Sequence, residues 1–235
     1  ILSLLNEKLE QQNHKEWIEQ IKAWKKEYPL RQEAIDPNGV TPQMLFDALN
    51  ELTKSEAIIA TEVGQHQMWA AQFYEFRHPR QFITSGGLGT MGFGLGAAMG
   101  AQVANPDKKV INIAGDGSFH MNCNELSTLA KYQIPMMELV VDNSVLGMVR
   151  QWQKLFYDNR FSQTTQDKKT DFVKLAEAFG VKAFEIHTKD ELIPVLKEAL
   201  GLKEPVLVAC HIHRDFNVLP MVPAGASAEE PILEM

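Results

Sequence analysis

The sequence has few of the features that mark secreted, membrane-spanning or nucleic-acid-binding proteins. Its two cysteines, Cys123 and Cys210, are too few for a disulfide framework. No apolar run approaches the length that spans a bilayer, and the first residues lack the basic flank and cleavage site of a signal peptide. The net charge of -7, with scattered basic residues, argues against a nucleic-acid partner. We therefore expect a cytoplasmic globular protein, with no membrane contact, whose two thiols are free and buried.

Several common catalytic motifs are also missing. The sequence has no phosphate loop ending in Gly-Lys, no Gly-x-Ser-x-Gly motif and no histidine pair at zinc spacing on a predicted helix. His211 and His213 alternate at the end of a predicted strand, but without a third ligand nearby such histidines are more often structural or surface residues. Residues 87–92 have the glycine spacing of a dinucleotide-binding turn. In such a motif a strong apolar strand precedes the turn, but here only the short run 82–84 does. Asp107 stands about where the ribose-binding acid would fall, but it lies in a polar turn. Nicotinamide binding is therefore a distant alternative.

Apolar runs of strand length alternate with segments of helical periodicity over most of the chain. The predicted strands are residues 57–61, 82–84, 110–114, 137–141, 183–186 and 206–211. The predicted helices are residues 42–52, a helix from 65, one ending at 104, 118–131, a helix from 147, 172–179 and 190–200. This alternation predicts an α/β fold with a parallel sheet of about six strands and helices on both faces.

Composition and periodicity suggest three parts of the chain. Residues 1–30 repeat apolar positions at helical spacing among Lys, Glu and Gln, so we expect the tail of a preceding middle domain or a linker helix. Residues 31–223 carry the strand and helix alternation and form the predicted main domain, and residues 224–235 are an expected irregular tail. Because the chain opens without Met inside a predicted helix, we expect a fragment of a longer polypeptide.

Two predicted strands end in oxygen-bearing side chains. Asp116 follows the apolar run 110–114, and Asn143 follows the run 137–141 closely. In a parallel sheet both ends lie at the carboxyl edge, where open α/β sheets bind their ligands. A Gly-Asp-Gly triplet by itself is more often a turn. An Asp and an Asn after separate strands favour a different interpretation, Mg²⁺ bridging to phosphates.

Three further side chains have two possible interpretations each. His66 follows a predicted strand and would lie at the same edge, with a solvent-facing histidine at a helix start as the alternative. Met148 and Trp152 share one helical face, and such a pair is ordinarily core. Because they follow the proposed metal site closely, they could instead wall a small apolar substrate pocket.

Together these residues resemble thiamine diphosphate enzymes, whose signature is Gly-Asp-Gly followed at this spacing by Asn. More narrowly, residues 61–72, 85–94 and 147–157 closely resemble the catalytic subunit of the acetohydroxyacid synthase family, also called acetolactate synthase. The resemblance covers residues 29–223. Gly-Asp-Gly identifies only the superfamily, whereas the Gln-Trp-Gln segment 151–153 is more specific and favours the biosynthetic enzyme.

The resemblance implies thiamine diphosphate and Mg²⁺ as cofactors. Asp116, Asn143 and the backbone carbonyl of Val145 would hold the metal ion. The residues implied to bind the cofactors are Val63, Gly64, Gln65, His66, Gly89, Met91, Gly115, Asp116, Gly117, Ser118, Asn143, Val145, Leu146, Gly147 and Met148. The backbone amides of Gly117 and Ser118 would donate to the diphosphate.

The resemblance also implies roles in the reaction. Met91 would wedge under the thiazolium ring and hold the cofactor bent, while Gln65 and His66 would aid proton movements. Met148 and Trp152 would line the substrate pocket, with Trp152 where the family selects its second substrate. One departure is Asp142, which stands where the family usually has Asn.

A member of this family would decarboxylate pyruvate and condense the resulting enamine with a second 2-oxo acid, pyruvate or 2-oxobutanoate, in branched-chain amino-acid biosynthesis. The resemblance implies a homodimer or tetramer of full-length chains and a possible regulatory small subunit. The N-terminal domain of a partner subunit would hold the cofactor's pyrimidine ring, and a middle domain would hold FAD. Since both are largely absent here, we expect weak cofactor binding and no activity from this fragment alone.

Two alternatives stay open. The chain could belong to another thiamine diphosphate enzyme, such as a pyruvate oxidase or a glyoxylate carboligase. It could also be a catalytically silent binding or assembly module, which would give no turnover even with the missing domains supplied.

Overall fold

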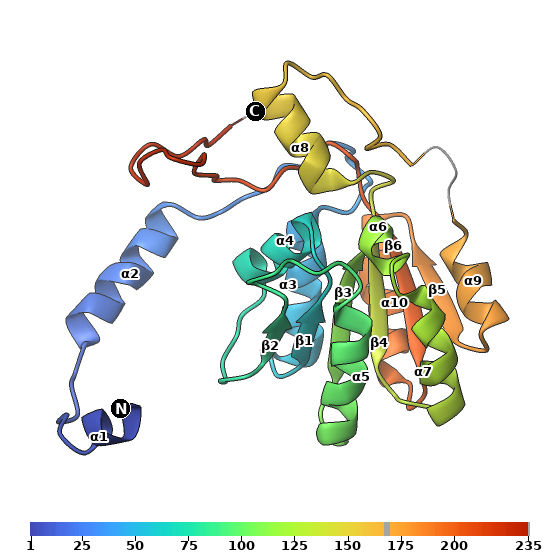
Figure 1. Cartoon of the computed structure of the whole chain (residues 1–235), viewed down its shortest axis with the longest axis horizontal. Helices are drawn as coiled ribbons and strands as arrows, with labels where there is room; N and C mark the ends of the chain where they lie inside the picture. Colours follow the sequence, from blue (N-terminus) through green and yellow to red (C-terminus); the bar gives the residue numbers. More distant parts are fainter. Residues whose placement is uncertain (167–169, 235) are drawn as a thin grey trace. The chain divides into compact units, whose positions relative to one another are not determined.

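The computed structural model describes residues 1–166 and 170–234, and the chain divides into two compact units. The first unit, Ile1–Gln32, contains helices α1 (Leu2–Asn6) and α2 (Lys15–Glu27) (Figure 1). The helical periodicity of this region is therefore interrupted between the two helices. No residue of either helix is buried, and the rings of Trp17 and Trp24 lie edge to face at 5.4 Å.

The second unit, Glu33–Met235, is built on a six-stranded sheet in which every pairing is parallel. The strands are β1 (Ile58–Thr61), β2 (Phe82–Thr84), β3 (Val110–Gly115), β4 (Met137–Asp142), β5 (Lys182–Ile186) and β6 (Val206–His211). Their order across the sheet is β2-β1-β3-β4-β6-β5. The predicted parallel sheet is confirmed, with strand bounds within one residue of those expected.

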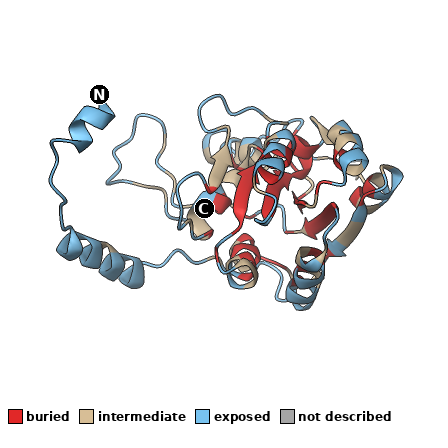
Figure 2. Ribbon diagram, turned by 90° about the horizontal axis from the view of Figure 1, so that it is seen from below, coloured by how far each residue is buried: buried red, intermediate tan, exposed pale blue. Residues whose placement is uncertain are grey.

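Helices cover both faces of this sheet (Figures 1 and 2). One face packs against α3 (Pro42–Thr53), α4 (Gln65–Phe73) and α10 (Lys189–Gly201). The other packs against α5 (Gly94–Ala104), α7 (Leu126–Tyr132) and α9 (Phe172–Ala178). Every residue of β3 and β4 is buried, which explains why these strands are mostly apolar rather than alternating. The polar exceptions, Asn112 and Glu138, are paired across the two strands, with Asn112 Nδ2 donating to the Glu138 carboxylate at 2.9 Å.

Local sequence signals fix several helix ends. Helix α3 begins where Thr41 Oγ1 accepts a hydrogen bond from the Met44 amide at 3.0 Å and Pro42 occupies the first turn. Helix α10 begins at a capping box formed by Thr188 and Glu191. Both helices therefore start within a residue of the predicted positions.

The predicted continuous helix 118–131 is wrong. The segment forms a short helix α6 (Asp116–Phe119), a 3₁₀ turn η1 (Cys123–Glu125) and α7. The break brings Asn122 Nδ2 to the backbone oxygen of Gly92 at 3.3 Å, and a Cβ on Gly92 would lie 3.1 Å from that of Met121. The chain thus leaves the helical path where it packs against the glycine-rich turn before α5.

The structure also tests the expectations about the two thiols and about membrane-spanning helices. Both thiols are free, but only Cys210, on β6, is buried; Cys123 is half-buried, so the expectation that both are buried is wrong. Across the described part of the chain, no helix is long and apolar enough to cross a membrane.

The order of the strands determines where a ligand site can form. From β1 the chain crosses to β2 on one side and then returns to β3 on the other, so the sheet has a switch point between β1 and β3. Parallel α/β sheets bind ligands at such a point, beyond the carboxyl ends of the strands. The remaining helix of this unit, α8 (Gly147–Phe156), begins five residues after the end of β4.

Candidate functional site

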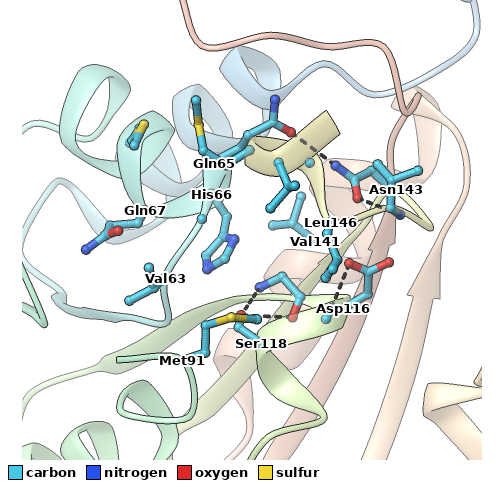
Figure 3. A pocket seen from close by; sticks show the side chains of 18 of the residues that line it. Val63, Gln65, His66, Gln67, Met91, Asp116, Ser118, Val141, Asn143 and Leu146 are labelled. Atoms are coloured by element: carbon cyan, nitrogen blue, oxygen red, sulfur yellow. Dashed lines mark hydrogen bonds between the residues drawn. The ribbon is translucent and has the colours of Figure 1, made fainter. Parts of the chain in front are cut away.

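A cavity of about 240 Å³ lies beyond the carboxyl ends of β1, β3 and β4 (Figure 3). Every residue assigned to the cofactors from the sequence lines it. The lining residues are Val63, Gly64, Gln65, His66, Gln67, Met68, Trp69, Gly89, Met91, Gly115, Asp116, Gly117, Ser118, Val141, Asn143, Val145, Leu146, Gly147, Met148 and Val149. Segments far apart in the sequence therefore meet at the switch point of the sheet.

Asp116 is a buried carboxylate at the end of β3. Its Oδ1 accepts a hydrogen bond from the Gly117 amide at 2.8 Å, so in this structure that amide is engaged by the carboxylate. Burial and the neighbouring Asp142 carboxylate raise the pKa of Asp116. Burial would also raise the pKa of Asp142, but hydrogen bonds from His211 and Asp116 outweigh it and lower that pKa. The two carboxylates therefore favour a cation, either a proton or a metal ion, beside Asp116.

Asn143 is held by a network that starts at Gln65. The Gln65 Nε2 group donates to Gln151 Oε1 at 2.9 Å and to the Phe216 backbone oxygen at 3.0 Å. Its Oε1 accepts from Asn143 Nδ2 at 3.3 Å, and Asn143 Oδ1 accepts from the Val145 amide at 3.2 Å. The Nε2 group of Gln65 donates to two other parts of the protein, which fixes this side chain. Its Oε1 then orients Asn143 by accepting the hydrogen bond from Nδ2.

His66 is a buried histidine in the cavity with a strongly shifted pKa. Burial lowers its pKa to about 3, against a weaker opposing effect from a hydrogen bond to the Glu62 backbone. Its Nε2 is buried and has no hydrogen-bond partner among the described residues. Because an unpaired buried polar atom costs free energy, this nitrogen fits a ligand that would occupy the cavity. His66 would meet that ligand as a neutral ring, not as a cation.

Two glycines let the backbone approach other parts of the site closely. A Cβ on Gly117 would lie 2.5 Å from Leu146 Cδ2, and one on Gly147 would overlap Gln65 Oε1. A side chain at Gly117 would therefore displace Leu146, and one at Gly147 would displace the hydrogen-bonded side chains of Gln65 and Asn143.

The glycine-rich turn that carries Met91 is held by Glu62. This carboxylate is 1% exposed and accepts hydrogen bonds from the Gly92 amide at 2.5 Å and the Leu95 amide at 3.1 Å. Burial raises its pKa, while these backbone hydrogen bonds oppose the rise. A carboxylate at the start of α5 also interacts favourably with the helix dipole. Glu62 therefore fixes the position of Met91 relative to β1.

Trp152 does not line the cavity. Helix α8 places Met148 and Val149 in the cavity wall, whereas Trp152 lies about one turn further along and is 44% exposed. Its ring contacts that of Phe156 edge to face at 5.4 Å. Of the two residues assigned to the substrate pocket, only Met148 therefore meets the cavity in this structure.

The sequence interpretation gave no role in the site to Glu62 or Gln151, and it identified Asp142 only as a departure from the family pattern. Glu62 follows the apolar strand β1, the same signal that identified Asp116 after β3, so it could have been found. Gln151 has no such signal, because its part in the network depends on contacts with Gln65 and with Val218, 86 and 67 residues away.

Comparison with known protein families gives a match over residues 62–210. The matching family is the thiamine pyrophosphate enzymes, through their C-terminal TPP-binding domain. This chain belongs to that family. Thiamine pyrophosphate is the same compound as thiamine diphosphate, and the matched range of the TPP-binding domain contains all of the cavity-lining residues.

Curated relatives of this TPP-binding domain carry acetolactate synthase names. The mitochondrial acetolactate synthase catalytic subunit of Saccharomyces cerevisiae is 47% identical over 219 residues, which cover 92% of this chain and 32% of that protein. The acetolactate synthase large subunit of Lactococcus lactis is 43% identical over 217 residues, 92% of this chain and 37% of that protein. A probable large subunit from Methanococcus aeolicus is 44% identical over 92% of this chain. The chain spans about a third of the length of these relatives.

Proposed function

We propose that this chain is the TPP-binding part of an acetohydroxyacid synthase catalytic subunit. The full-length protein would decarboxylate pyruvate and join the two-carbon unit to pyruvate or 2-oxobutanoate, in branched-chain amino-acid biosynthesis. The main support is a single cavity that gathers every predicted cofactor residue, in a chain 42–47% identical to acetolactate synthases.

Asp116, Asn143 and the Val145 carbonyl are the proposed ligands of Mg²⁺. Their donors are all oxygens, which is what Mg²⁺ prefers, and Asp116 and Asn143 are buried at neighbouring strand ends. Bound thiamine diphosphate supplies the electron sink for loss of carbon dioxide from a 2-oxo acid. The residues that contact the cofactor are the proposed set given above.

The chain's own side chains would position and shield this chemistry. Met91, on the turn held by Glu62, would contact the thiazolium ring and help to hold the cofactor bent. The neutral ring of His66 would donate or accept a hydrogen bond, with Gln65 oriented beside it, so both are candidates for proton movements. Met148 would line the substrate pocket, and Trp152 would reach the second substrate once the site is closed by other parts of the protein.

We propose that the N-terminal domain of a partner subunit closes the site. An apolar face of α8 supports this, since Val149 and Phe156 are 50% and 42% exposed on either side of Trp152. The full-length protein would form a homodimer or tetramer with FAD in its middle domain, with a regulatory small subunit as a possible partner. We propose the cytoplasm as its location, while the S. cerevisiae relative is named mitochondrial.

The test of this function is titration of thiamine diphosphate into the full-length protein, with and without Mg²⁺, for the wild type and Asp116→Ala. We expect Mg²⁺-dependent binding that the substitution abolishes, because it removes the charged metal ligand. Asp107→Ala, in an exposed turn that does not line the cavity, is the matched control and should bind normally. Mg²⁺-independent binding, or equal binding by Asp116→Ala, would refute the proposed site.

A second assay separates this function from the alternatives. In an acetohydroxyacid synthase, Trp152→Leu should shift the choice between pyruvate and 2-oxobutanoate as second substrate. A pyruvate oxidase or glyoxylate carboligase would show no such choice, and a silent module would give no turnover with any 2-oxo acid.

A further inference from the structure

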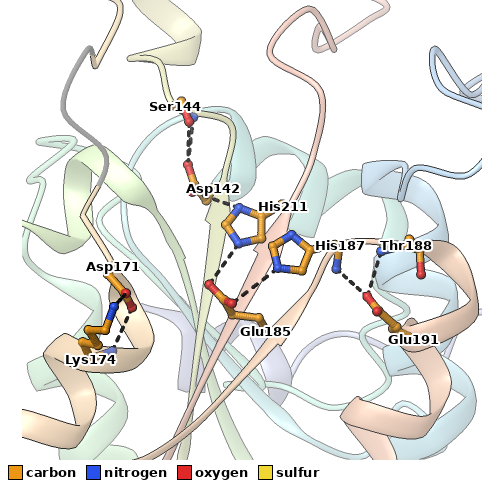
Figure 4. A network of polar contacts seen from close by, with 9 residues as sticks. All are labelled: Asp142, Ser144, Asp171, Lys174, Glu185, His187, Thr188, Glu191 and His211. Atoms are coloured by element: carbon orange, nitrogen blue, oxygen red, sulfur yellow. Dashed lines mark hydrogen bonds and ion pairs between the residues drawn. The ribbon is translucent and has the colours of Figure 1, made fainter.

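A second group of titratable side chains lies at the carboxyl edge of the sheet, outside the cavity (Figure 4). Glu185 is on β5, His187 follows that strand directly, and His211 ends β6. A ligand atom of each lies within 4.8 Å of the others. None of the three lines the cavity described above.

The sheet register brings these side chains together. Strands β5 and β6 are parallel, with Ile186 beside Cys210, so the next pair in register is His187 and His211. Side chains in register on neighbouring strands are about 4.8 Å apart. The two imidazole rings are accordingly stacked at 4.3 Å, with 4° between their planes.

Both rings turn the same nitrogen toward one carboxylate. His211 Nε2 lies 3.4 Å from Glu185 Oε1, and His187 Nε2 lies 3.4 Å from Glu185 Oε2. Two ligand atoms bound to a tetrahedral zinc ion at about 2.05 Å are about 3.3 Å apart. The two nitrogen–oxygen separations therefore match those between ligands of one ion.

Asp142 gives the cluster the outer partner that metal-binding histidines usually have. His211 Nδ1 lies 3.1 Å from Asp142 Oδ2, and Asp142 is itself held by the Ser144 amide at 2.8 Å. A carboxylate at Nδ1 fixes that proton and leaves the Nε2 lone pair facing outward, toward Glu185. Since lone pairs of nitrogen and carboxylate oxygen repel, this arrangement favours a cation between them, either a proton or a metal ion.

We propose that Glu185, His187 and His211 bind a divalent transition-metal ion such as Zn²⁺, with water completing its coordination. Two imidazoles and a carboxylate favour Zn²⁺ over Mg²⁺, which prefers oxygen donors. The parallel rings direct their lone pairs side by side, so His187 must rotate for the two to converge. Its side chain is 57% exposed, which leaves it room to do so.

The test is calorimetric titration of ZnCl₂ into the full-length protein, prepared without a histidine tag and kept in excess Mg²⁺ to fill the oxygen site. A Cys123→Ser background removes the half-buried thiol as a competing ligand. The test variant is His187→Ala, which alters an exposed side chain and should leave the fold intact. The matched control is His78→Ala, because His78 pairs with one glutamate, Glu56, and has no second histidine beside it in the described structure.

We expect one zinc ion per chain that His187→Ala weakens by at least about 10-fold, the lower range for loss of even an outer-shell partner. Glu185→Gln should weaken the same event, while His78→Ala should leave it unchanged. Absence of zinc binding to the background protein would overturn the proposal. So would equal affinities for the background protein and His187→Ala, or equal losses in His187→Ala and His78→Ala. None of these readouts depends on thiamine diphosphate or on turnover.

Discussion

Glu62→Gln is the sharpest test of how the cavity is built. The Glu62 carboxylate holds the turn that carries Met91 through the amides of Gly92 and Leu95, at 2.5 and 3.1 Å. Glutamine has the same shape but only one acceptor oxygen, so its amide group would face one of these backbone donors. One hydrogen bond is lost and a buried donor is left without an acceptor.

The magnitude follows from the two contacts. A hydrogen bond to a charged group contributes about 1.5–3 kcal/mol, and leaving its partner unpaired costs about 1–3 kcal/mol. Removing a buried charge offsets part of this loss, since burial already raises the pKa of Glu62. We therefore expect the turn to be destabilised by about 2 kcal/mol, which corresponds to about 30-fold in a local opening equilibrium.

Two measurements on the full-length protein check this expectation. Hydrogen exchange of the amides in residues 89–95 should be about 30-fold faster in Glu62→Gln. Thiamine diphosphate should also bind more weakly in Mg²⁺, because Met91 is less firmly placed. Glu56→Gln, an exposed glutamate paired with His78, is the control and should change neither. Unchanged exchange and unchanged affinity in Glu62→Gln would refute the reasoning.

Two other substitutions test the cavity. In Gly147→Ala, the added Cβ would overlap Gln65 Oε1 and lie 2.9 Å from Asn143 Nδ2, so calorimetry should show loss of Mg²⁺-dependent cofactor binding with an unchanged circular dichroism spectrum. Normal binding would contradict the proposed arrangement. His66 stays neutral in the fold, with a pKa of about 3, whereas the unfolded chain takes up a proton below about pH 6.5. The free energy of unfolding therefore decreases as pH falls from 6.5 toward 3, and His66 lowers it by about 2 kcal/mol at pH 5. His66→Gln should reduce the fall in melting temperature between pH 7 and 5, and equal falls would contradict this.

The sequence predicted the sheet well because its strands carry a strong local signal. The central strands β3 and β4 are buried on both faces, so each reads as a mostly apolar run, interrupted only by Asn112 and Glu138, with small or polar residues at its end. The same strand ends identified Asp116 and Asn143. The break in the helix after Asp116 could not be predicted from the local sequence, because it comes from packing of Asn122 against the distant Gly92.

The sequence by itself determined the parallel α/β fold and the position of Asp116 and Asn143 at its carboxyl edge, because periodicity and strand-end chemistry are local properties of the chain. Only the tertiary structure decided which distant residues meet. Gln65 reaches Gln151 across 86 residues, and His187 meets His211 because the sheet order places β5 beside β6. Such contacts depend on how the strands are ordered and on how the helices cross over them, and no window of sequence contains that information.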